Sequence, residues 1–173
     1  MNLVESTHPL LNSPLNDIEN IDISELQKLA DEMYGFVETK GGAGLSANQV
    51  GIDKRMFVVK YQDYQQTFIN PRIMWESDRK LMLEEGCLTF PGLFMNVKRP
   101  DAIRMTFIDY DGKKQEEQIF MGITNRIILH EYDHMEGKFF YDNLSNLQRD
   151  RWTKKLKKKL GVNLANSTIK RYA

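Results

Sequence analysis

Cysteine, histidine and long apolar runs are all scarce in this sequence of 173 residues, which holds one cysteine and three histidines. With Cys87 alone, no internal disulfide is possible, which fits a reducing compartment and leaves the thiol free for packing or chemistry. No apolar run approaches the about 20 residues that cross a bilayer, so no membrane partner is expected. Residues 1–25 carry five acids and no basic leader, unlike secretory signals and transit peptides. These absences predict a cytoplasmic protein.

The sequence also lacks an excess of either charge, since 24 basic residues balance 24 acids. DNA is not an expected partner. The balance hides a gradient, because residues 1–40 hold eight acids and two lysines, whereas residues 149–173 hold nine basic residues and one acid. The basic end predicts contact with a polyanion.

The length fits one domain, and no repeat or linker divides the sequence, so one domain over residues 1–173 is expected. A helix is expected over residues 22–42, a second from about Ile123, and a basic one over residues 146–160. Four extended segments lie between the first two helices: 55–61, 66–75, 102–110 and 115–120. This order predicts an α+β fold with antiparallel β-sheets packed around the central helix that begins near Ile123, an N-terminal helix and a C-terminal basic helix.

That central helix carries the sequence "IILHEYDHMEGK" at residues 127–138. On a helix, His130 and His134 lie four residues apart on one face and present two imidazoles to one point. Glu131 lies about 100° round from His130, as the general base does in HExxH metallohydrolases. The alternative is an ordinary polar helix face with two packed or solvated histidines.

A catalytic metal centre needs a third protein ligand, and the sequence downstream offers few. Phe140 stands where metzincins have their third histidine, and no glutamate follows Glu136. The candidates upstream are His8, a carboxylate and Cys87. A thiolate is a strong ligand for zinc or ferrous iron, which favours Cys87. A small buried hydrophobe is the plainer role for a lone cysteine, but the glycine and two glutamates before it argue for an open site.

A small-residue loop, "GAGLSANQVG" at residues 42–51, suits close approach of backbone to a substrate. Its Gln49 offers a neutral amide that could stabilise an oxyanion. Together with "EGCLT" at 85–89 and "HEYDH" at 130–134, this loop resembles the three motifs of peptide deformylases, G-x-G-L-A-A-x-Q, E-G-C-L-S and Q-H-E-x-D-H. "STHPLL", "QTFINPRI" and "GKFFYDNLS" extend the resemblance over nearly the whole chain.

The resemblance implies a metal-dependent hydrolase that removes the formyl group from formyl-methionine of new polypeptides and releases formate. The metal would be Fe²⁺, with Zn²⁺, Ni²⁺ or Co²⁺ as substitutes, held by Cys87, His130 and His134. Glu131 would be the acid/base. The oxyanion would be stabilised by the Gln49 amide and the Leu88 N–H, and the peptide would be contacted by Ala43, Gly44 and Gly86.

The sequence departs from the family motifs at Ser46, Thr89 and Leu129, which stand where the family has alanine, serine and glutamine. None of these positions is a ligand or the base. Arg126 falls near the region that forms the methionine pocket in the family. An arginine at this position is expected to change the size or polarity of that pocket. The resemblance also implies that Asp133 pairs with Arg99.

The implied partners are formyl-methionine nascent peptides and, through the basic helix over residues 146–160, the bacterial ribosome. We expect a monomer from a bacterium, or a phage-encoded one that acts in a bacterial host. Two other classes stay open on the residues alone, a zinc endopeptidase and a non-catalytic metal- or peptide-binding module. The missing downstream ligand argues against the first, and the presence of Glu131 and Gln49 argues against the second.

Overall fold

The computed structural model describes residues 1–145, 147–148, 150–151 and 153–154. Two α-helices and three short 3₁₀ helices are described: α1 (Ile23–Lys40), α2 (Gly122–Met135), η1 (Pro9–Leu11), η2 (Ala47–Val50) and η3 (Phe140–Asn143). The strands are β1 (Gly44–Ser46), β2 (Met56–Tyr61), β3 (Tyr64–Glu76), β4 (Lys80–Cys87), β5 (Phe90–Pro100), β6 (Ala102–Ile108) and β7 (Lys114–Met121). Over these residues, no helix is long and apolar enough to span a membrane.

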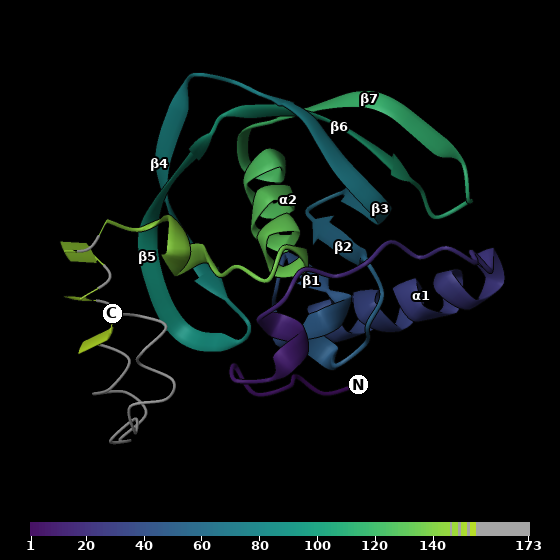
Figure 1. Cartoon of the computed structure of the whole chain (residues 1–173), viewed down its shortest axis with the longest axis horizontal. Coiled ribbons are helices and arrows are strands. Elements are labelled where there is room, and N and C mark those ends of the chain that lie inside the picture. Colours follow the sequence, from purple (N-terminus) through teal and green to yellow (C-terminus); the bar gives the residue numbers. More distant parts are fainter. Residues whose placement is uncertain (146, 149, 152, 155–173) are drawn as a thin grey trace.

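The strands form two antiparallel sheets, one of five strands in the order β1-β2-β3-β6-β7 and one of two strands, β4-β5. The chain passes from β3 into β4 and from β5 into β6, so it crosses between the sheets twice. Figure 1 shows α2 between them, with β4 and β5 on one side and the larger sheet on the other. The predicted α+β fold with sheets around a central helix is thus confirmed.

The first helix begins and ends where its terminal residues dictate. Asp22 caps α1 by accepting a hydrogen bond from the Glu25 N–H at 3.2 Å, and Gly41 ends it with φ 62°, a left-handed conformation that glycine adopts without steric cost. Buried Leu26, Ala30, Met33 and Val37 recur at helical spacing along one face. The helix predicted over residues 22–42 is therefore confirmed to within two residues at each end.

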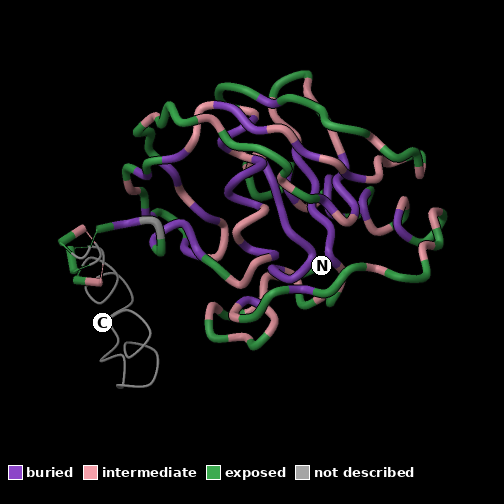
Figure 2. The backbone as a smooth tube through the Cα atoms, turned by 45° about the horizontal axis from the view of Figure 1, so that its top comes forward, coloured by how far each residue is buried: buried purple, intermediate pink, exposed green. Residues whose placement is uncertain are grey.

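Two apolar clusters sandwich the five-stranded sheet. Alternate residues of β2 point to opposite faces, so Met56 and Val58 pack with α1 while Phe57 and Val59 pack on the α2 side. Figure 2 shows this buried centre of the chain in purple. Burial of each such side chain contributes about 1.5–3 kcal/mol, which holds α1, the sheet and α2 together as layers.

Residues 80–100 were not predicted as strands, yet they form β4 and β5. Their apolar residues are scattered, and Met82 and Phe94 are more than half exposed. The pattern therefore lacks the half-buried alternation that marked the other strands. The helix predicted over residues 146–160 falls mostly on residues outside those described (146, 149, 152 and 155–173).

Candidate active site

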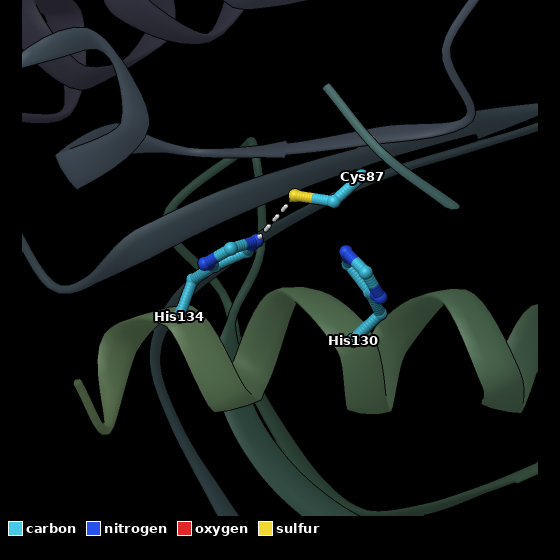
Figure 3. Close-up of side chains that lie close together, drawn as sticks. All are labelled: Cys87, His130 and His134. Atoms are coloured by element: carbon cyan, nitrogen blue, oxygen red, sulfur yellow. Dashed lines mark hydrogen bonds between the residues drawn. The ribbon is translucent and has the colours of Figure 1, made fainter. Parts of the chain in front are cut away.

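Three side chains, one from β4 and two from α2, meet beside the central helix. Cys87 ends β4, and His130 and His134 project from α2 (Figure 3). Their ligand atoms all lie within 4.8 Å of one another, with Cys87 Sγ 3.2 Å from His134 Nε2. Each residue is at most 8% exposed. The structure thus brings together the three residues expected as metal ligands, whereas His8 lies elsewhere and accepts a hydrogen bond from the Leu10 N–H at 3.3 Å.

The orientation of His130 is fixed by a carboxylate. Glu85 Oε2 lies 3.0 Å from His130 Nδ1, so Nε2 is the nitrogen left for a metal. Glu85 is held in turn by Arg99, whose Nε and NH2 groups donate at 2.6 and 2.9 Å. Arg99 NH1 also donates to Asp133 at 2.7 Å, which confirms the expected Asp133–Arg99 pair. These contacts fix the orientation of the His130 imidazole ring.

Glu85 is a functional residue that the sequence analysis missed. The two glutamates before Cys87 were taken as a sign of an open strand, but Glu85 is only 6% exposed. Burial alone would raise the pKa of Glu85, yet hydrogen bonds from His130 and Arg99 outweigh it and lower the pKa to about 2. A carboxylate with several charged partners can be buried, and this network was not visible in the spacing of the sequence.

Glu131 lies on the other flank of the same helix, against β1. Its Oε2 is 3.0 Å from Ser46 Oγ, and its carbonyl oxygen is 2.8 Å from the same hydroxyl. A Cβ at Gly44 would stand 2.7 Å from Glu131 Oε1, so only glycine leaves room for this carboxylate. Burial raises the pKa of Glu131, although His130 and His134 oppose that effect. A carboxylate that binds protons more tightly than usual suits an acid/base role.

Gln49 reaches the cluster from η2. Its Oε1 accepts a hydrogen bond from the Ser46 N–H at 2.9 Å, which orients the amide. Its Nε2 then faces Cys87 Sγ at 3.6 Å and Thr89 Oγ1 at 3.1 Å. The amide of Gln49 therefore presents N–H donors beside the cluster, where an oxyanion would need them.

A cavity of about 500 Å³ opens onto these groups. Its lining includes every residue expected to contact the reacting group or the peptide apart from His134: Ala43, Gly44, Gln49, Gly86, Cys87, Leu88, His130 and Glu131. Gly86 has a further reason to be glycine, because a Cβ there would stand 2.5 Å from Phe94 Cε1 on the paired strand. The glycine thus makes room for an aromatic wall of the cavity.

The cluster fits a divalent cation by its chemistry. Burial of the Cys87 thiol would raise its pKa, but His134 and His130 outweigh this and lower the pKa well below its usual value. A thiolate with two imidazoles is a donor set suited to Fe²⁺, Zn²⁺, Co²⁺ or Ni²⁺. Within the described residues, His134 Nδ1 is buried without a hydrogen-bond partner, so that ring is placed only by packing and by its Nε2 side.

A buried Cys-His-His cluster beside a buried glutamate, on a helix between antiparallel sheets, is the arrangement of a metal-dependent hydrolase. Comparisons with known proteins make this class more specific. The model of the polypeptide deformylase family matches residues 1–150. The chain belongs to the polypeptide deformylase family.

Relatives cover most of the chain. A peptide deformylase of Phenylobacterium zucineum is 36% identical over 156 residues, which are 87% of this chain and 91% of that protein. One of Stutzerimonas stutzeri is 37% identical over 161 residues, 91% of this chain and 95% of that protein. A solved Plasmodium falciparum peptide deformylase matches with a TM-score of 0.84 and 32% identity, and covers 96% of this chain and 99% of its own.

Proposed function

We propose that this chain removes the formyl group from the N-terminal formyl-methionine of new polypeptides, with residues 1–173 acting as one catalytic domain. The observation that carries the proposal is the shared cavity. The Cys87, His130 and His134 donors, the buried Glu131 carboxylate and the Gln49 amide all border it or lie beside it. Family membership agrees with this assignment.

Cys87, His130 and His134 would hold a divalent metal through Sγ and two imidazole nitrogens. When bound, the ion would activate water and polarise the formyl carbonyl. Glu131 takes the proton that the attacking water loses and delivers it to the leaving amine. Its contacts with Gly44 and Ser46 hold the carboxylate at the wall of the cavity. The products are formate and a peptide with a free N-terminal methionine.

The negative charge that develops on the formyl oxygen needs donors. The side-chain amide of Gln49 and the backbone N–H of Leu88 are proposed for this role, since both residues line the cavity beside Cys87. Loss of one such donor typically costs about 100-fold or more in rate. Ala43, Gly44 and Gly86 would contact the peptide, because a methyl group or no side chain at all leaves their backbone open at the wall of the cavity.

Fe²⁺ is the proposed metal, with Zn²⁺, Ni²⁺ or Co²⁺ as substitutes. A thiolate next to ferrous iron is open to oxidation, so activity should decay in air and persist after exchange for nickel or cobalt. The test is anaerobic purification followed by metal analysis and assays before and after exposure to air. Equal decay of the iron and nickel forms would contradict the assignment.

A coupled assay for formate tests the activity itself. Formyl-Met-Ala-Ser should release formate, whereas acetyl-Met-Ala-Ser should release no acetate at a comparable rate. Denatured casein should stay uncut, which separates this function from an endopeptidase. Release of acetate at the same rate, or no formate at all, would contradict the proposal.

The cytoplasm of a bacterium, or of a host bacterium for a phage-encoded chain, is the proposed location, with a monomer as the proposed state. The bacterial ribosome is the proposed partner of the basic residues in 149–173. Those residues lie mostly outside the described part of the chain, and the proposal rests on their charge. Deletion of residues 149–173 should reduce sedimentation with ribosomes at low salt, and equal sedimentation of both proteins would contradict it.

A further inference from the structure

Arg126 is a buried arginine in the wall of the cavity, and the proposed reaction gives this residue no role. It lies on α2 one turn before His130 and is 5% exposed. Ile123, about one turn before it on the helix, and Ile127, directly after it, line the same cavity. The cavity wall therefore combines two aliphatic side chains with a guanidinium.

The hydrogen bonds of Arg126 leave part of its donor capacity unused. NH1 donates to Glu85 Oε1 at 2.9 Å and to the Val97 carbonyl at 2.8 Å, and NH2 donates to the Leu81 carbonyl at 2.7 Å. A guanidinium has five N–H groups. In the described part of the chain, the Nε–H and the second N–H of NH2 have no acceptor. The Nε atom is not completely buried, so it can be reached from the cavity. This side chain can therefore donate hydrogen bonds to an occupant of the cavity.

The charges around Arg126 decide which kind of acceptor suits it. Two arginines, Arg99 and Arg126, share two carboxylates, Glu85 and Asp133. Both guanidinium groups already have carboxylate partners, and the buried Glu131 carboxylate lines the same cavity, so a carboxylate on the occupant would meet like charge at high cost. A neutral oxygen can accept from the spare N–H groups without that cost. The expected ligand group is a neutral oxygen acceptor.

In the substrate, the first side chain branches from the carbon next to the formylated nitrogen, so it must enter this cavity when the formyl group reaches the cluster. One carboxylate, Glu85, separates the guanidinium of Arg126 from the imidazole of His130. The thioether of methionine is only a weak acceptor, whereas the oxygen of methionine sulfoxide is a strong one. A purely apolar wall would reject the sulfoxide, because it would bury an unpaired oxygen.

We propose that Arg126 is a specificity-determining residue that lets the enzyme accept an oxygen-bearing first side chain, so that formyl-methionine sulfoxide peptides are deformylated as substrates. The inference rests on the proposed deformylase function. Its chemical content is a hydrogen bond from the guanidinium to the sulfoxide oxygen, added to the aliphatic contacts that any unbranched side chain makes with Ile123 and Ile127.

The test compares kcat/KM for three peptides: formyl-Met-Ala-Ser, its norleucine analogue and its methionine sulfoxide analogue. For the parent enzyme, the sulfoxide peptide should fall within about 10-fold of the norleucine peptide. In Arg126→Met, the ratio of sulfoxide to norleucine should drop by about 10-fold or more, the size of a lost hydrogen bond from a charged donor. Each ratio is taken on one preparation, so differences in metal content or folded fraction cancel.

Two further variants keep the test decisive. Arg126→Lys preserves charge but loses the planar fork and should lower the same ratio, which serves if Arg126→Met fails to fold. Ile123→Leu changes the same wall without changing its donors and should leave the ratio unaltered. A parent enzyme that disfavours the sulfoxide by more than about 100-fold, or equal ratios in the parent and both Arg126 variants, would overturn the inference. Formate release from formyl-Met-Ala-Ser with equal ratios would leave the proposed function intact, whereas no formate from any peptide would remove that function.

Discussion

The two sheets hold α2 by different physical means. The five-stranded sheet packs against the helix through apolar side chains such as Phe57, Phe68 and Ile128, and it contacts Glu131 through β1. The two-stranded sheet is joined to the helix by charges, since Glu85 on β4 and Arg99 on β5 meet His130 and Asp133. One sheet thus supports the proposed base, and the other supports the proposed ligands.

This difference matches what each group needs. Apolar burial has no preferred direction, but it excludes water and raises the pKa of Glu131. Charged hydrogen bonds are directional, and they fix the ring of His130 so that one nitrogen faces Cys87. A metal site needs that orientation, because an outer partner typically changes affinity or activity about 10- to 100-fold. Substitutions on the two sides of α2 should therefore have separable effects.

The largest effect is expected at Glu131, on the side of the five-stranded sheet. Glu131→Gln keeps the shape of the side chain but cannot take a proton, so turnover should fall by about 100- to 10,000-fold. Metal content should stay at the parent level, because Glu131 is not among the clustered ligand atoms. Formate assays and metal analysis on the same sample measure both, with Glu116→Gln on exposed β7 as the control. Parallel loss of metal and activity would place Glu131 in the ligand set.

On the side of the two-stranded sheet, Arg99→Met removes the partner shared by Glu85 and Asp133. Removing one member of a buried ionic pair costs about 3–5 kcal/mol of stability, and metal affinity should fall about 10- to 100-fold. Phe68→Leu is the comparison change in the apolar core; it shortens a fully buried aromatic side chain and should cost about 1–3 kcal/mol.

Urea unfolding and competition with a metal chelator distinguish these two variants. Phe68→Leu should leave metal affinity at the parent value, although it lowers the free energy of unfolding. If both variants changed metal affinity by the same factor, the distinction between the two sheets would be wrong.

A smaller effect is expected where α1 meets the five-stranded sheet. Burial raises the pKa of Tyr34 to about 12, and its hydroxyl lies 2.9 Å from Thr67 Oγ1. A raised pKa means that the native state holds this proton more tightly than the unfolded chain. Its contribution to stability is therefore complete below pH 10 and lost as the pH rises towards 12.

Tyr34→Phe tests this titration. The variant should be about 1–3 kcal/mol less stable at pH 8, because Thr67 loses its partner, yet its stability should fall less steeply between pH 10 and 12. Urea unfolding at pH 8, 10 and 11 gives both quantities. Identical slopes for the parent and the variant would show that Tyr34 does not titrate in this range.

The smallest effect is expected for Ser46→Ala, which removes the hydroxyl beside Glu131. Loss of one hydrogen bond of about 1 kcal/mol corresponds to a roughly 5-fold change, and we expect it as a fall in kcat with KM unchanged. Metal affinity should not change, because Ser46 belongs to the sheet that supports the base. A fall in metal content would show that Ser46 supports the ligands as well.

The sequence predicted the helices α1 and α2, four strands and the three candidate metal ligands, because these follow local patterns or the preference of a metal. Four of the seven strands in the described part of the chain were found because β-branched and aromatic residues mark them. His130 and His134 were found because a helix places i and i+4 on one face. Cys87 was chosen among three candidates through thiolate chemistry. Each of these inferences needs only neighbours in the sequence or the preference of a metal.

The rest of the site depends on contacts between distant residues. Glu85, Arg99 and Arg126 meet only because β4 and β5 fold over α2, and nothing in the spacing of the chain shows that three charged side chains share one buried volume. The same holds for Gly44, which is glycine because Glu131, 87 residues later in the chain, takes the space of its Cβ. The sequence analysis was therefore wrong in treating charged residues such as Glu85 as a sign of exposure.

The central claim is that the two-stranded sheet and α2 jointly build a metal site through Cys87, His130 and His134. The absorption spectrum of the cobalt-loaded protein tests it most directly, because only thiolate ligation gives a strong sulfur-to-cobalt charge-transfer band in the near ultraviolet. The parent protein should show this band, Cys87→Ser should lose both the band and tight binding, and Glu131→Gln should keep both. A Cys87→Ser protein with the parent spectrum, metal content and rate would contradict the account.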